Sequence, residues 1–142
     1  MANYKIKKNN VPALIKSVSG RILGEAVLKG ALILETEVKT SMATASHSGR
    51  TYKGHKASAP GETPATDTGV LINSLISRLE SATPKRAKAT FGPTVEYGVY
   101  LEYGTSKMEK RPYLRPAFDK KLSTIESTIR EYVTSKLKGA SQ

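Results

Sequence analysis

Few side chains in this sequence have the type and spacing that catalysis or metal binding requires. His47 and His55 stand eight residues apart with no third ligand close by, so we interpret them as solvated loop residues and not as a metal site. Glu96 and Glu102 could form an acid–base pair. Six residues apart on a short helix they point in different directions, and capping or ion pairing is the better interpretation.

The remaining signatures of catalysis are missing as well. Ser58 does not stand in the G-x-S-x-G pattern of a nucleophile elbow. There is no cysteine, and neither of the common glycine-rich nucleotide-binding patterns occurs. We therefore expect no catalytic residue, no metal site, no cofactor and no enzymatic activity.

The net charge is the strongest signal in the composition. The 142 residues include 23 Lys and Arg against 12 Asp and Glu, a formal charge of +11 that is spread evenly along the chain. Such an excess indicates either an anionic partner or a solubilising surface. An even spread favours the second, because counterion release rewards clustered cations. The longest apolar stretch, residues 31–34, is far shorter than the ~20 residues that span a bilayer, so no membrane partner is expected.

The elements expected from periodicity form an α+β domain that covers residues 1–142 as one unit. A long helix is predicted over 11–42 and a C-terminal helix over 113–138, because apolar residues recur there every three or four positions. Short helices and strands are predicted over 70–105. They include two antiparallel strands joined by the turn at 84–86, and a short helix that ends at Gly104. We expect the small sheet to pack against both long helices.

Residues 43–69 differ in composition from the rest of the chain. Small, polar and turn-forming residues dominate, with hardly an apolar anchor, so the segment is predicted to be an extended flexible loop. Asp67 or Thr68 is the expected cap of the short helix that follows. The tyrosines at 97, 100, 103 and 113 allow two interpretations. They could stack on nucleic-acid bases, or they could pack in a helix–sheet seam or against a partner protein, which we favour.

Three stretches in this order, ASAPGETPATDTGVL (57–71), YGVYLEYGT (97–105) and RPYLRPAF (111–118), resemble a known family. The chain is similar to the neck proteins of tailed bacteriophages, the head–tail joining or tail-completion proteins of long-tailed phages. The resemblance implies a structural virion protein, assembled in the host cytoplasm, that forms a ring at the junction of head and tail. Such rings are commonly hexameric and line the path of the ejected DNA. The implied partners are further copies of the chain, neighbouring neck and connector proteins, and tail-tube or tail-terminator proteins.

Two sets of residues are the candidates for these contacts. The predicted interface residues are Arg50, Tyr52, Pro60, Gly61, Pro64, Asp67, Tyr97, Tyr100, Glu102, Tyr103, Arg111, Tyr113 and Arg115. The predicted DNA-channel residues, which would attract passing DNA without reading its sequence, are Lys53, Lys56, Lys85, Arg86, Lys107 and Lys110. The alternative hypothesis is a free-standing basic nucleic-acid-binding protein, whose isolated monomer would bind DNA with a steep salt dependence.

Overall fold

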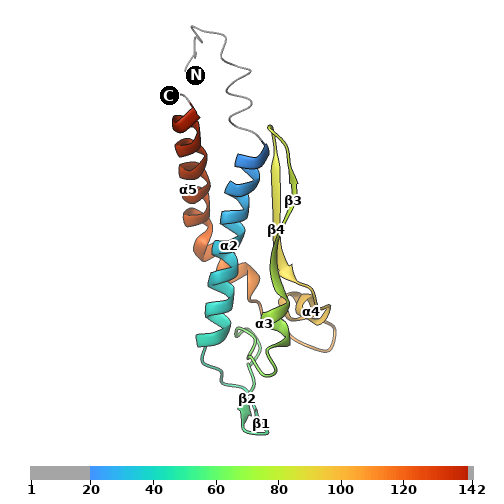
Figure 1. The fold of residues 1–142 in the computed structure, drawn as a ribbon. Helices are drawn as coiled ribbons and strands as arrows, with labels where there is room; N and C mark the ends of the chain where they lie inside the picture. The colour runs from blue at the N-terminus through green and yellow to red at the C-terminus, as the bar shows by residue number, and fades with distance from the viewer. Residues whose placement is uncertain (1–19, 141–142) are drawn as a thin grey trace.

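The computed structural model describes residues 20–140 and shows an elongated α+β fold (Figure 1). The elements follow in the order α2 (Gly20–Thr44), β1 (Thr51–Tyr52), β2 (His55–Lys56), α3 (Val70–Ser74), β3 (Leu75–Ala82), β4 (Ala87–Pro93), α4 (Tyr97–Tyr103) and α5 (Leu114–Ala140). The predicted α+β class is confirmed. Residues 11–19 of the predicted first helix lie outside the described residues, and the helix ends at Thr44, two residues later than expected.

Helix α2 is the middle layer of the molecule. The β3–β4 hairpin packs on one of its faces and α5 packs on another, so the sheet rests mainly on α2 and not on both long helices (Figure 1). Glycines mark both contacts. A Cβ at Gly24 would lie 3.0 Å from a methyl group of Leu79 in β3, and one at Gly30 would lie 2.9 Å from Cγ2 of Ile125 in α5. These glycines lower the helix propensity, but they let both neighbours approach closely.

The β3–β4 hairpin is confirmed, with its turn at residues 83–86 between the two strands. The strands pair antiparallel from Leu75 opposite Pro93 to Ala82 opposite Ala87. Thr83 closes the turn, since its hydroxyl oxygen accepts a hydrogen bond from the backbone N–H of Arg86 at 3.0 Å. Side chains at alternate positions of β4 are partly buried toward α2, and the others face solvent, which is the expected pattern for a sheet covered on one face.

Helices α3 and α4 form where the sequence predicts short helices. Helix α4 ends at Gly104, whose φ of 79° lies in the region that favours glycine, as predicted. The predicted cap of α3 is wrong, because Gly69 with φ 78° precedes this helix and no side chain caps it. Helix α5 begins at Leu114 and continues to Ala140, two residues beyond the predicted end at residue 138.

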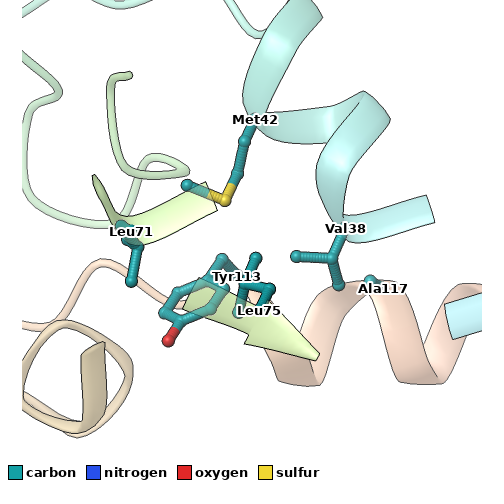
Figure 2. Packing of buried hydrophobic residues seen from close by; sticks show 6 residues of the cluster. All are labelled: Val38, Met42, Leu71, Leu75, Tyr113 and Ala117. Carbon is teal, nitrogen blue, oxygen red and sulfur yellow. The ribbon is translucent and has the colours of Figure 1, made fainter. Parts of the chain in front are cut away.

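The buried core lies where α2, α3, β3 and the start of α5 meet. Figure 2 shows Val38 and Met42 from α2 directed toward Leu71, Leu75 and the ring of Tyr113. Further along α5 the packing is more open, since Phe118 and Leu122 of its apolar stripe remain 39% and 38% exposed. No helix within residues 20–140 is both long and apolar enough to cross a bilayer.

Candidate functional site

The three stretches that carry the family resemblance come together in the structure, although up to about fifty residues separate them along the chain. The backbone N–H of Arg111 donates to the carbonyl of Leu101 at 2.6 Å, and that of Gly61 donates to the carbonyl of Lys110, the residue just before the third stretch, at 3.0 Å. The Arg111 guanidinium donates through Nε to the carbonyl of Ser58 at 3.3 Å. Residues 57–71, 97–105 and 111–118 therefore form one hydrogen-bonded body, which we call the motif unit.

Glu102 joins α4 to α5 inside the motif unit. Its side chain is only 7% exposed, and Oε2 accepts hydrogen bonds from the backbone N–H groups of Tyr113 (2.8 Å) and Leu114 (2.9 Å). Oε1 accepts one from Arg115 at 2.9 Å. The first turn of a helix has N–H groups without intrahelical partners and a positive dipole end, so a carboxylate is the natural cap there. The capping interpretation of Glu102 is correct, and its assignment to an interface is wrong.

Tyr113 is likewise buried within the chain. Its side chain is 2% exposed, and its hydroxyl donates to the carbonyl of Gly98 at 2.9 Å. Burial first, and then the negative charge of Glu102, raises the pKa of this hydroxyl well above its ordinary value. Pro64 is also buried. For Tyr113 and Pro64 the interface assignment is therefore wrong, and Tyr113 occupies the helix–sheet seam.

The other tyrosines of α4 form an exposed row. Tyr97, Tyr100 and Tyr103 are 44%, 44% and 79% exposed, and their spacing of three places them on one face of the helix. We call this row the tyrosine ridge. The opposite face of α4 carries Gly98 and Glu102, which are buried. The Tyr100 hydroxyl donates to Glu96 at 2.6 Å, and this bond raises the pKa of the hydroxyl. One face of α4 is therefore packed inside the fold, and the other face exposes aromatic rings to solvent.

Most of the remaining interface candidates lie next to this ridge. A cavity of about 340 Å³ is lined by Tyr52, Asp67, Val70, Tyr97 and Arg111, among others. A second hollow of about 410 Å³ lies beside Tyr103 and is bordered by Pro60 and Gly61. Arg115 is exposed at the start of α5, where its Nε donates to Asp119 at 3.1 Å.

Comparison with known proteins gives no relative. No family model, no curated protein and no solved structure matches this chain. Function is therefore inferred from the residues and their geometry. Within the part of the chain that the structure describes, no group of three or more His, Asp or Glu side chains is arranged to hold a metal ion.

The segment expected to be an extended loop contains a short β-hairpin. Strands β1 and β2 pair Thr51 with Lys56 and Tyr52 with His55. The turn residues Lys53 and Gly54 have φ values of 48° and 80°, the left-handed pair that a two-residue hairpin turn requires. Strands of two residues show no periodicity, so the sequence analysis missed them. The one available signal was Gly54, which can adopt the left-handed conformation of a hairpin turn, and a single glycine is a weak signal.

The ends of this hairpin are fastened by Glu62. Its carboxylate accepts hydrogen bonds from the Ser48 backbone N–H at 3.1 Å, from the Ser48 hydroxyl and from the Ala59 N–H at 2.8 Å. These bonds, led by that of the Ser48 hydroxyl, lower the pKa of Glu62 to about 2. Because the pKa in the folded protein lies below the ordinary 4.5, the stabilisation is complete above pH 4.5 and is lost as the pH falls toward about 2.

We expect the amide protons of Ser48 and Ala59 to titrate together with a midpoint near pH 2, measured by NMR. In Glu62→Gln the transition should vanish, and the Ala59 amide should exchange about tenfold faster at neutral pH, because a charged acceptor is lost. Glu109→Gln, an exposed carboxylate elsewhere on the surface, is the matched control and should change neither. A midpoint near pH 4.5 would contradict this account of the hairpin base.

The predicted DNA-channel residues do not form a single patch. Lys53 and Lys56 lie on the β1–β2 hairpin at one end of the molecule, whereas Lys85 and Arg86 lie in the β3–β4 turn near the other end (Figure 1). Lys107 and Lys110 stand between α4 and α5. The sequence analysis treated them as one set, and only the fold shows that they are three separate groups.

Proposed function

We propose that this chain is a structural protein of a phage neck, which assembles as a ring that joins head to tail. The observation that carries the proposal is the motif unit. The three stretches that resemble the neck family are far apart in the sequence, yet they form one hydrogen-bonded body. A resemblance confined to unrelated surface loops would give no such result.

The exposed surface of the motif unit supports a protein partner. Tyrosine is enriched at protein–protein interfaces, where its ring supplies contact area at little cost in conformational entropy. The tyrosine ridge places three such rings side by side, and Val99 on the same helix is 49% exposed. Because a large part of each of these side chains is exposed in the isolated chain, covering them by a neighbour would be favourable.

A ring also needs a second, different surface on the same chain, because each copy meets the next head to tail. The open part of the α2–α5 packing has that character. A groove of about 320 Å³ runs between α2, α5 and β4, and its walls include Ala31, Phe91 and Phe118. The ridge lies on α4, whereas the groove lies between α2, α5 and β4, so the two surfaces belong to different parts of the chain. Contact between them would therefore be heterologous and compatible with a closed ring.

The test is the mass of the full chain in solution, alone and with tailless heads or headless tails, together with restoration of head–tail joining. Tyr100→Ser/Tyr103→Ser should reduce assembly or joining about tenfold or more, since buried tyrosines at interfaces often contribute about 2 kcal/mol each. Tyr100→Phe/Tyr103→Phe keeps the rings and is the matched control. Both variants should unfold within about 0.5 kcal/mol of the parent protein, since these side chains are exposed.

Two results would contradict the proposal. One is normal joining by the serine variant, which would show that the ridge is not part of the interface. The other is a monomer that ignores both particles and binds DNA with a steep salt dependence. That result would favour the free-standing nucleic-acid-binding protein.

A further inference from the structure

We propose that the β1–β2 hairpin, residues 49–57, binds the phosphate backbone of duplex DNA. The inference rests on the proposed neck function for the identity of the polyanion that passes the protein. It rests on the hairpin's own charge and geometry for the site. The proposed site contains Lys53 and Lys56, two of the cations expected to face DNA. It also contains Arg50, which was predicted from the sequence to lie in a protein interface.

The charge of the hairpin is the first observation. Arg50, Lys53 and Lys56 are all exposed, and none of them forms an ion pair with a carboxylate of the described residues. No Asp or Glu occurs from residue 43 to residue 61. The nearest acid along the chain, Glu62, already accepts hydrogen bonds from Ser48 and Ala59. The positive charge is therefore not neutralised locally.

Several cations of the long helices are placed differently from those of the hairpin. On the long helices several of them pair with acids. Examples are Lys39 with Glu35 at 2.7 Å and Lys120 with Glu37 at 2.6 Å. Such pairs are solvated helix-surface contacts, and each removes a cation from those available to an outside anion. The hairpin has no equivalent pairs.

The second observation is that the hairpin fixes the backbone positions from which its cations extend. Its base is closed by hydrogen bonds from Gly49 N–H to the Ala57 carbonyl at 3.0 Å and from Ala57 N–H to the Arg50 carbonyl at 3.1 Å. At the turn, the Lys53 ammonium lies over the ring of Tyr52, 5.4 Å from its centre. A fixed arrangement of charges loses less entropy on binding than the same cations on a flexible loop.

The third observation is shape. The hairpin projects from the end of the molecule beyond α2 and α3 (Figure 1). Its strands pair with each other and with no other described strand, so both edges of this ribbon are free, while Tyr52 and His55 line the cavity next to α4. A two-stranded ribbon is narrow enough to enter the major groove of B-form DNA, with its basic side chains near the phosphates on either side. The broader β3–β4 hairpin has one face against α2.

Duplex DNA fits this hairpin better than an acidic protein does. Lysine is depleted in the buried centres of protein–protein interfaces, where apolar and aromatic anchors dominate. Tyr52 is the one large apolar side chain among the seven residues 50–56, against three cations. Contacts of cations with a regular row of phosphates need no such anchors, because counterion release supplies the free energy.

The test measures binding of the full chain to a mixed-sequence duplex of about 30 base pairs as a function of salt. Three phosphate contacts predict that Arg50→Ala/Lys53→Ala/Lys56→Ala reduces the slope of log K against log salt by about 2.7. We expect its affinity at low salt to fall tenfold or more. The matched control, Arg78→Ala/Lys88→Ala/Arg130→Ala, removes the same charge from exposed positions outside the hairpin. It should keep the slope within about one unit.

Three outcomes would overturn the proposal. They are an equal loss in both triple variants, a larger loss in Lys85→Ala/Arg86→Ala than in the hairpin variant, and binding to polyglutamate but not to DNA. Head–tail joining by the hairpin variant separates this inference from the proposed function. Normal joining together with lost DNA binding in the hairpin variant supports both the DNA-binding inference and the proposed function. Lost joining together with retained DNA binding in the ridge variant supports the ridge as an interface.

Discussion

Glu102→Ala is expected to lower the free energy of unfolding by about 3–4 kcal/mol, the largest effect that the structure predicts for a single residue. The substitution removes the acceptor of three backbone N–H groups at the start of α5, at Tyr113, Leu114 and Arg115. Two of these groups can regain water, but that of Tyr113 belongs to a buried residue. The loss should appear as a lower midpoint in urea with an unchanged slope, since the native surface area stays similar.

Two variants separate the cap from general effects of substitution on α4. Glu102→Gln keeps the size of the side chain but turns an NH₂ group toward a donor, so it should lose at least half as much stability as the alanine variant. Glu96→Gln lies on the exposed side of the same helix, where the carboxylate accepts only the Tyr100 hydroxyl, and should cost less than about 0.5 kcal/mol. Equal losses for the two glutamines would refute the cap.

Gly98→Ala is expected to lower the free energy of unfolding by about 2 kcal/mol, although alanine favours a helix. A Cβ at this position would lie 2.6 Å and 2.7 Å from two ring carbons of Pro93, and 3.0 Å from the Tyr113 hydroxyl oxygen. The proline ring cannot turn away, so α4 would have to move from the end of β4. That movement also stretches the hydrogen bond from Tyr113 to the Gly98 carbonyl.

Gly139→Ala is the matched control, because Gly139 also stands in a helix and a Cβ there meets nothing within 4 Å. This control should be neutral or slightly stabilising, as the greater helix propensity of alanine would be unopposed. Thermal unfolding followed by circular dichroism measures both variants. A Gly98→Ala protein as stable as its parent would mean that α4 is not held against Pro93.

Local patterns were sufficient to predict most elements of the fold. The β3–β4 hairpin follows from two short extended runs around Thr83 and Pro84, and α5 follows from its step of three and four residues. The end of α4 follows from Gly104 alone. Each of these signals lies within the element that it predicts, so no knowledge of distant contacts was needed.

Two errors were local, namely the cap of α3 and the missed β1–β2 hairpin, and the others concern contacts between distant parts of the chain. That Glu102 caps α5, that Tyr113 is buried and that α2 separates the sheet from α5 depend on which segments meet, and periodicity holds no such information. Tyr97 and Tyr113 have the same side chain, yet one is exposed and the other buried. The candidate site was predicted in part, because the tyrosines of α4 were identified but not which of them face outward.

The central position of α2 has a consequence for synthesis on the ribosome. Helix α2 is made before its partner α5, which begins at Leu114, 94 residues after Gly20. At 5–20 residues per second, the face of α2 around Gly30 waits roughly 5–20 s for that partner. The β3–β4 hairpin emerges sooner and can cover the face around Gly24. The nascent chain therefore carries one helix with a bare apolar stripe for seconds, which makes it a natural substrate for chaperones that bind such stripes.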